Sequence, residues 1–219
     1  MPRTVILDVN ETLSDTAALA GVLAGIGAGG VAPSAWLAAT LRDGFALSLT
    51  TGARPFADVS RQALAVLLST ETDLTGSVDD GVERVMAAFA ELPVHADVPD
   101  GLRALAAAGH RIVTLSNGSA DYARSLLERA GVADSVDAFL SVDEVGVWKP
   151  HRDAYAHALA RTGAAAADCT LVAVHPWDLH GARAAGLGIV HLDREGGAWP
   201  EAFTRPDLRI RALGDLVLP

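Results

Sequence analysis

The sequence has one cysteine, Cys169, in 219 residues. A single thiol cannot form a disulfide within the chain, which fits a reducing compartment, and we expect Cys169 to be buried and inert. No apolar run approaches the ~18 residues that a membrane-spanning helix needs. An acidic residue, Asp8, interrupts the stretch that would be apolar in a secretion signal. These absences predict a cytoplasmic protein that is neither secreted nor embedded in a membrane.

Basic residues are scarce relative to acidic ones. The chain has 17 Lys and Arg against 27 Asp and Glu, a formal charge of −10. Such a charge repels polyanions, so we expect neither nucleic acid nor an anionic membrane surface as a partner. Half of the residues are hydrophobic, which excludes a disordered chain. The length suits one large domain or a main domain with a smaller one inserted.

Two patterns of predicted secondary structure follow one another. Residues 4–9 form a β-branched apolar run, typical of a buried strand. From about residue 14 to residue 92 the pattern is helical, with apolar residues at helical spacing in 34–49, 56–68 and 78–92. After Pro93, strands are predicted at 110–115, 138–141, 171–174 and 188–192, and helices at 101–108, 120–130, 151–161 and 178–185.

Strands that alternate with helices of about ten residues indicate βαβ units, and therefore a parallel sheet with helices on both faces. We therefore predict an α/β protein with a Rossmann-like core. The core is expected to consist of residues 1–14 and 93–219. The helical stretch 15–92 is expected to form a cap domain inserted after the first strand.

Polar residues gather where the predicted strands end, which is where open parallel sheets bind ligands. Any one of them fits an ordinary loop or helix cap. Together, four strand or loop ends bring acid, amide, hydroxyl and amine groups to one edge, which predicts a catalytic site. The residues are Asp8, Asn10, Glu11 and Thr12, then Ser116 and Asn117, then Lys149, and finally His175 and Asp178.

These residues lie in four ordered segments that resemble the motifs of the haloacid dehalogenase superfamily. The segments are Asp8-Val9-Asn10-Glu11-Thr12-Leu13, Leu115-Ser116-Asn117-Gly118, Lys149-Pro150 and His175-Pro176-Trp177-Asp178. The resemblance covers essentially the whole chain. Leu41-Arg42-Asp43, and Tyr155 six residues after Lys149, are similar to motifs of the type II 2-haloacid dehalogenase branch.

Asn10 favours this branch on chemical grounds. Superfamily phosphatases carry a second aspartate at this position, which protonates the leaving alcohol and helps to seat a magnesium ion. An amide cannot act as a general acid at neutral pH and is a poorer ligand for a hard cation. Halide leaves without a proton, so we predict dehalogenation with no metal and no cofactor. A loop amide without a chemical role remains the alternative for Asn10.

The resemblance implies a covalent mechanism on a small halogenated carboxylic acid. Asp8 would attack the halogen-bearing carbon and form an ester, Lys149 would keep Asp8 ionised, and Asp178 would orient or activate the hydrolytic water. Thr12 and Tyr155 would fix carboxylate oxygens. The other implied roles are substrate carboxylate binding by Ser116 and halide binding by Arg42 and Asn117.

Three positions differ from the branch or stay open. The best-known type II enzymes have a serine and an asparagine where this sequence has Ala173 and His175. His175 either activates water, since imidazole titrates near neutrality, or only donates to a backbone carbonyl. Glu11 stands where many relatives have glycine, and we expect its side chain to point to a neighbouring loop. Trp177 either walls the pocket or packs in the core.

The predicted activity is hydrolysis of (S)-2-haloacids or haloacetates to 2-hydroxy acids. Two alternatives are a magnesium-dependent phosphatase of a small phosphomonoester and a non-catalytic protein that binds an anion. Asp8, Lys149 and Asp178 together argue against a non-catalytic site, because such a cluster of charges is costly. The histidines lack the spacing of a zinc site. The oligomeric state stays open, with a homodimer as one option.

Overall fold

The computed structural model describes residues 3–218. They group into two compact units: the residues up to Ser14 with those from Val94 onward form the first, and Asp15–Pro93 form the second. The predicted domains, 1–14 with 93–219 and 15–92, differ from these units only in the assignment of Pro93. As domains that fold or move independently, they remain a prediction.

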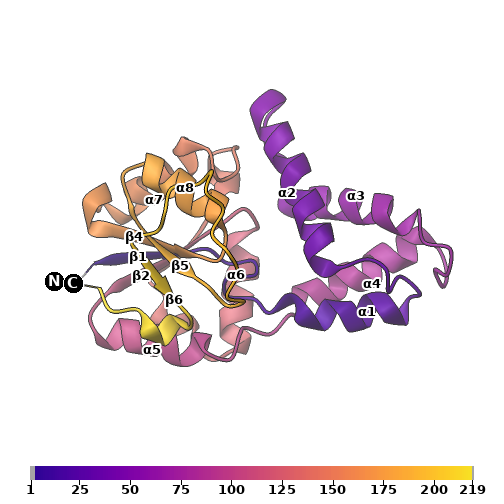
Figure 1. Cartoon of the computed structure of the whole chain (residues 1–219), viewed down its shortest axis with the longest axis horizontal. Helices are drawn as coiled ribbons and strands as arrows, with labels where there is room; N and C mark the ends of the chain where they lie inside the picture. The colour runs from indigo at the N-terminus through magenta and orange to yellow at the C-terminus, as the bar shows by residue number, and fades with distance from the viewer. Residues whose placement is uncertain (1–2, 219) are drawn as a thin grey trace. The chain divides into compact units, whose positions relative to one another are not determined.

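The first unit is built on a six-stranded parallel sheet (Figure 1). The strands are β1 (Thr4–Leu7), β2 (Arg111–Ser116), β3 (Ala138–Ser141), β4 (Cys169–Ala173), β5 (Gly188–Leu192) and β6 (Leu208–Ile210). Their order is β3-β2-β1-β4-β5-β6, and Leu7 of β1 lies opposite Thr114 of β2 and Val172 of β4. The order reverses direction beside β1, the point at which open α/β sheets bind ligands. The predicted Rossmann-like α/β fold is confirmed.

The sequence pattern does not predict β6. This strand is three residues long, and two of them, Leu208 and Arg209, are exposed. It pairs with β5 at one edge of the sheet, where Val190 lies opposite Leu208. Short edge strands that carry charge resist pairing with other chains, and they have too little apolar periodicity to be recognised.

Helices cover both faces of the sheet, as Figure 1 shows for α5 on one side and α7 with α8 on the other. They are α5 (Val98–Ala107), α6 (Ala120–Arg129), α7 (Arg152–Thr162) and α8 (Pro176–Ala184). Leu102 of α5 and Leu126 of α6 join one apolar core with Val5 and Leu7 of β1. Burial of apolar side chains on both faces explains why the strands read as continuous hydrophobic runs.

The start of α8 matters for the site. Pro176 is the first residue of the helix, a position where a missing N–H costs nothing. His175 precedes it as the N-cap residue, and Asp178 lies in the first turn, where the helix dipole favours a negative charge. The short connection from β4 therefore carries both side chains to the same edge of the sheet as Asp8.

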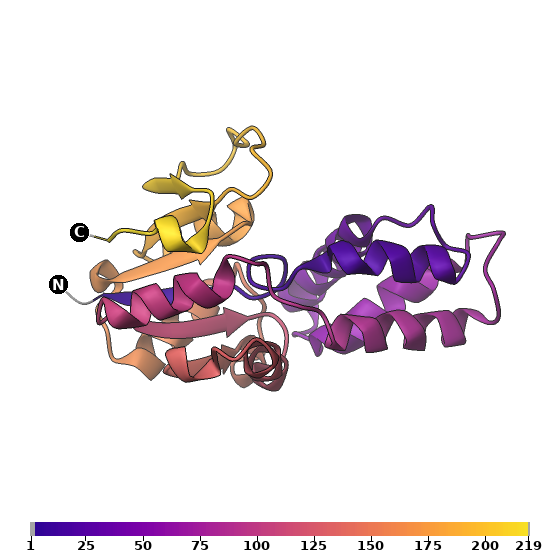
Figure 2. The ribbon, with the colours of Figure 1, turned by 90° about the horizontal axis from the view of Figure 1, so that it is seen from below.

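The second unit consists of helices (Figure 2). They are α1 (Leu19–Gly25), α2 (Pro33–Thr50), α3 (Phe56–Leu68) and α4 (Val78–Ala90). Trp36 is fully buried, packs edge-on against Phe89 with ring centroids 5.6 Å apart, and donates its indole N–H to Ser60 O at 2.9 Å. Within residues 3–218, no helix combines the length and the apolar character needed to cross a membrane.

Candidate active site

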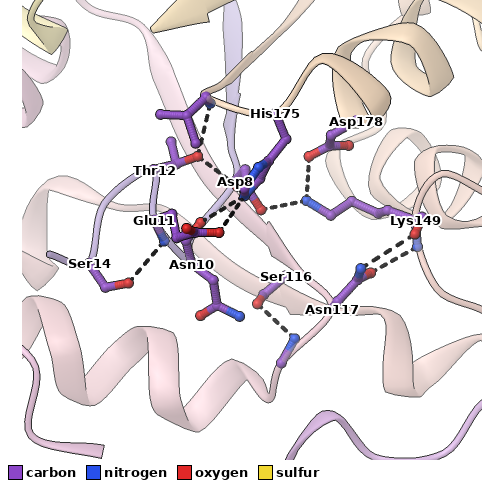
Figure 3. Close-up of polar contacts among 12 residues, drawn as sticks. Asp8, Asn10, Glu11, Thr12, Ser14, Ser116, Asn117, Lys149, His175 and Asp178 are labelled. Carbon is purple, nitrogen blue, oxygen red and sulfur yellow. Dashed lines mark hydrogen bonds and ion pairs between the residues drawn. The ribbon is translucent and has the colours of Figure 1, made fainter. Parts of the chain in front are cut away.

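A buried lysine joins two buried carboxylates at the carboxyl edge of the sheet (Figure 3). Lys149 Nζ donates to Asp8 Oδ1 at 2.8 Å and to Asp178 Oδ2 at 2.6 Å. Asp8 is 4% exposed, and the other two side chains are inaccessible to solvent. Lys149 is also the only lysine in the sequence. One ammonium therefore serves two carboxylates, which makes the group sensitive to the loss of any member.

The surroundings shift the pKa values of Asp8 and Asp178 in opposite directions. Burial alone would raise the pKa of Asp8, but the charges of Lys149 and His175, with hydrogen bonds from Lys149 and Thr12, hold it below its usual value. At Asp178, burial prevails over Lys149 and raises the pKa. Burial would lower the pKa of Lys149, but the two carboxylates raise it. Asp8 is thus kept as a carboxylate, the form that a nucleophile needs, and Asp178 is the better proton acceptor.

Thr12 holds the second oxygen of Asp8. Its hydroxyl donates to Asp8 Oδ2 at 2.6 Å and accepts from the backbone N–H of Val174 at 3.1 Å. The loop after β1 is therefore tied to the end of β4 through a buried hydroxyl. With Lys149 on one oxygen and Thr12 on the other, the Asp8 carboxylate has a fixed orientation.

Tyr155, on α7, contacts Asp178 rather than Asp8. Its hydroxyl lies 2.7 Å from Asp178 Oδ1 and donates to it, while Lys149 occupies the other oxygen. Burial and the adjacent carboxylate raise the pKa of Tyr155 well above its ordinary value, so the phenol remains a donor. Gly181 makes this packing feasible, because a Cβ there would lie 2.6 Å from both the Tyr155 hydroxyl and Pro150.

Asn117 braces the main chain of Lys149. Its Oδ1 accepts from the Lys149 N–H at 2.8 Å, and its Nδ2 donates to the Lys149 carbonyl at 3.4 Å. Ser116, at the end of β2, accepts from the N–H of Gly118 at 2.9 Å. The implied roles of Asn117 toward halide and of Ser116 toward the substrate carboxylate stay predictions. What the structure adds is a positioning role for Asn117.

Asn10 presents a buried amide oxygen that has no hydrogen-bond partner among the described residues. Leaving such an atom unpaired costs ~1–3 kcal/mol, so it is an available acceptor at the site. Within the same residues, no three His, Cys, Asp or Glu side chains are grouped to hold a metal ion. The second carboxylate that a hard cation requires is replaced here by the Asn10 amide. Function without a metal stays a prediction.

His175 lies between Asp8 and Glu11 (Figure 3). Its Nε2 is 3.2 Å from the Asn10 carbonyl oxygen and 3.6 Å from both Asp8 Oδ2 and Glu11 Oε2. The half-buried Trp177 stacks on the imidazole, with ring centroids 5.1 Å apart. The Glu11 side chain, in the loop after β1, therefore faces His175, which lies in the loop after β4. The Trp177 ring on one face of the imidazole and the oxygen atoms around Nε2 together favour one orientation of the His175 ring.

Arg42 lies in the second unit, on α2. Its side chain is 74% exposed and pairs with the adjacent Asp43, with 2.7 Å between Nε and Oδ1. An exposed pair of chain neighbours contributes little to stability. The structure therefore gives Arg42 a local contact within its own helix, and its halide-binding role stays a prediction.

Arg194 supports the site but was not among the predicted residues. Its guanidinium donates to the Thr12 carbonyl at 2.8 Å and to Asp97 Oδ1 at 2.7 Å, which fixes the end of the loop that carries Asp8. A signal for it exists, because Arg194 comes two residues after β5 and so at the same edge of the sheet. Its partners are distant in sequence, so its role could not be read from spacing.

The fold and the site define a class of protein: an α/β protein with a buried aspartate, paired with a buried lysine, at the carboxyl edge of its sheet. The chain belongs to the haloacid dehalogenase-like hydrolases, because the model of that family matches residues 2–186. The resemblance seen in the four sequence motifs is thereby confirmed.

Within this family, the chain is similar to proteins named as 2-haloacid dehalogenases. The chain is 33% identical to a (S)-2-haloacid dehalogenase of Pseudomonas sp. strain YL over 59% of this chain and 56% of that protein. It is 32% identical to the (S)-2-haloacid dehalogenase of Xanthobacter autotrophicus over 89% and 76%. A structure of the Xanthobacter autotrophicus L-2-haloacid dehalogenase with covalently bound chloropropionic acid aligns with a TM-score of 0.78 at 26% identity, covering 98% of this chain and 96% of that one. The matched stretch spans less than two thirds of the first three curated relatives, at 56, 60 and 58% of their lengths.

Proposed function

We propose that this protein is a hydrolytic dehalogenase that converts (S)-2-haloacids, or haloacetates, to 2-hydroxy acids. The observation that carries the proposal is the setting of Asp8, which is buried and accepts from Lys149 at one carboxylate oxygen and from Thr12 at the other. The relatives named as (S)-2-haloacid dehalogenases support it, as does the related structure with chloropropionic acid covalently bound.

In the first step, Asp8 acts as the nucleophile. One carboxylate oxygen bonds to the carbon that carries the halogen, and the carbon–halogen bond breaks with its electron pair leaving on the halide. No proton is needed, which agrees with the amide of Asn10 at the position where an acid would otherwise serve. The product of this step is an ester between the substrate carbon and Asp8.

In the second step, water opens the ester. The water oxygen bonds to Cγ of Asp8 while a water proton passes to Asp178, whose raised pKa suits it to accept one. The bond between Cγ and the substrate-bearing oxygen then breaks, and Asp178 returns the proton to the leaving alcohol oxygen. Asp8 emerges as the acid and loses its remaining proton to solvent. The net change consumes one water and releases halide, a hydroxy acid and a proton.

Isotope labelling tests this sequence of steps. In a single turnover of excess enzyme with (S)-2-chloropropionate in ¹⁸O-water, we expect the label in the peptide that contains Asp8 and an unlabelled product hydroxyl. The reason is that the product oxygen comes from Asp8 and the water oxygen replaces it. The product should be the (R)-2-hydroxy acid, since one displacement at carbon inverts the configuration. Peptide and product mass spectrometry measure both labels.

The reverse labelling, with ¹⁸O in the product and none in the Asp8 peptide, would show direct attack of water on the substrate and would refute the covalent step. The same reaction is also run with EDTA, and we expect the rate of halide release to be the same with and without the chelator. If EDTA abolished halide release and magnesium restored it, the reaction would depend on a metal ion and this part of the proposal would be wrong. Turnover of a phosphomonoester with added magnesium, without any halide release, would identify the phosphatase alternative.

Arg42 carries a separate prediction. In the proposed reaction its guanidinium donates to the departing halide, so Arg42→Ala should slow the first step by on the order of 10²–10³-fold, as the loss of a donor to developing charge does. Rapid-quench measurement of halide release checks this. Asp43→Asn is the matched control, since it breaks the same surface pair without removing the guanidinium. An unchanged rate in Arg42→Ala would leave Arg42 as a surface charge.

The proposal includes a cytoplasmic location, supported by one free, buried cysteine, Cys169. A homodimer is the oligomeric state included in the proposal, and light scattering of the purified protein measures it.

A further inference from the structure

The imidazole of His175 is surrounded by acceptors on its Nε2 side. Nε2 lies 3.2 Å from the Asn10 carbonyl oxygen and 3.6 Å from one carboxylate oxygen each of Asp8 and Glu11. A lone pair on Nε2 would face three oxygen atoms that ordinarily accept, which favours the form of the imidazole with a hydrogen on Nε2. With a hydrogen on Nε2, this nitrogen cannot take a proton from water. It can only donate.

We propose that His175 is an N–H donor to Asp8 Oδ2 during hydrolysis of the ester, rather than the base that activates water, and that Glu11 is the positioning residue that holds the imidazole there. The inference rests on the proposed function, because it concerns the second step of that reaction. Its basis is that the Thr12 hydroxyl donates to Asp8 Oδ2 at 2.6 Å while His175 Nε2 lies 3.6 Å from the same oxygen (Figure 3).

The chemistry of the second step calls for donors at this oxygen. When water adds to Cγ, the carbonyl oxygen of the ester takes up a negative charge, and donors aimed at that oxygen lower the barrier. We assign Oδ2 as the carbonyl oxygen and Oδ1, beside Lys149, as the oxygen bonded to the substrate. A separation of 3.6 Å is too long for a hydrogen bond in the resting protein. It shortens as charge develops on Oδ2, as catalytic contacts commonly do.

The backbone at Glu11 supports a role for its side chain. Glu11 has a φ of 62°, and no other non-glycine residue in 3–218 has a positive φ. For a residue with a Cβ, this left-handed conformation costs ~1–2 kcal/mol, which glycine would not incur. The Ser14 hydroxyl accepts from the Glu11 N–H at 3.1 Å, and His95 Nε2 lies 3.0 Å from the Glu11 carbonyl oxygen. A strained glutamate with its carboxylate beside His175 indicates a functional contact.

Two replacements of His175 separate a donor from a base. Gln can place an amide N–H near the position of Nε2 but cannot accept a proton, whereas Ala supplies neither. We expect His175→Ala to slow ester hydrolysis by about 10²-fold, the size of effect seen when one such donor is lost. His175→Gln should stay within about tenfold of the wild type. In rapid-quench experiments with (S)-2-chloropropionate, the peptide containing Asp8 should accumulate as the ester in the Ala variant.

Gln and Ala variants that are equally slow would overturn the assignment, because a base is lost in both. A wild-type protein that releases no halide and forms no ester would instead refute the proposed function, so the two failures are distinguishable. His180→Gln, at an exposed histidine within α8, the helix that His175 caps, is the matched control and should leave both steps unchanged.

Substitutions at Glu11 give a second, independent test, and they do not remove the His175 side chain from the site. Glu11→Gly should raise the melting temperature, because the left-handed strain is relieved, and yet it should cause ester to accumulate, because His175 loses its support. Glu11→Gln keeps the backbone strain and the side-chain shape but removes the charge. A Glu11→Gly variant that is more stable and hydrolyses the ester at the wild-type rate would refute the positioning role.

Discussion

Asp8→Asn is expected to slow halide release by on the order of 10⁴–10⁶-fold, the scale on which removal of a covalent nucleophile reduces a rate. The amide has nearly the same shape as the carboxylate, but it has no negative charge and attacks carbon poorly. Asp8 is held by Lys149 at 2.8 Å and by Thr12 at 2.6 Å, so the variant loses chemistry rather than position. Halide release in a single turnover is the measurement.

The fold of Asp8→Asn should survive, because Lys149 keeps its 2.6 Å contact with Asp178 and so remains paired. We therefore expect a urea midpoint close to that of the wild type. Asp58→Asn, an exposed residue in the first turn of α3, is the matched control for an amide substitution and should retain full activity. Halide release by Asp8→Asn at more than a few percent of the wild-type rate would mean that Asp8 is not the nucleophile.

Lys149→Met is expected to have the largest effect on stability. The substitution retains an apolar chain of similar length but leaves two buried carboxylates without their ammonium partner. Breaking a buried ion pair by removing one partner typically costs ~3–5 kcal/mol. The variant should also lose halide release, because Asp8 is then no longer favoured as a carboxylate. The free energy of unfolding in urea at pH 7 measures the first effect.

The pH dependence gives Lys149→Met a distinctive profile. In the wild type, the lowered pKa of Asp8 contributes stability that is present above its unfolded value of ~3.9 and is lost as pH falls through the folded value. Without Lys149, burial raises the pKa of both carboxyls, so the folded state binds protons more readily than the unfolded state. The variant should therefore become more stable as pH falls from 7 to 5.

A second substitution checks this explanation. Lys149→Met combined with Asp178→Asn leaves one buried carboxylate instead of two, and it should recover part of the lost stability at pH 7. If the double variant were no more stable than Lys149→Met, repulsion between the two carboxylates would not be the cause. If the stability of Lys149→Met were also independent of pH between 5 and 7, loss of packing would account for its whole loss of stability.

Much of the candidate site follows from local patterns in the sequence. Asp8, Lys149 and Asp178 each come directly after or beside a recognisable element, and parallel strands must bring their carboxyl ends to one edge of the sheet. Periodicity therefore predicts that these three residues meet. It does not predict how they divide the charge, because a pKa depends on burial and on distances of a few ångströms.

Other features of the site depend on contacts between residues that are far apart in the chain. Nothing local indicates that Asn117 grips the Lys149 main chain 32 residues away, or that Arg194 reaches the Thr12 carbonyl 182 residues away. The same holds for Tyr155, whose hydroxyl contacts Asp178 across two helices. The identity of Glu11 is visible in the sequence, but its positive φ and its approach to His175 are not.

The amino-acid sequence by itself determined the alternation of β1 to β5 with the core helices, the parallel α/β class and the family, because apolar periodicity and motif order are properties of the chain alone. It also determined which groups stand at the ends of the strands. The tertiary structure alone decided which oxygen of Asp8 each donor approaches and which acceptors surround Nε2 of His175. The physical reason is that hydrogen bonds require separations near 3 Å, and such separations between distant segments are set only when the whole core packs.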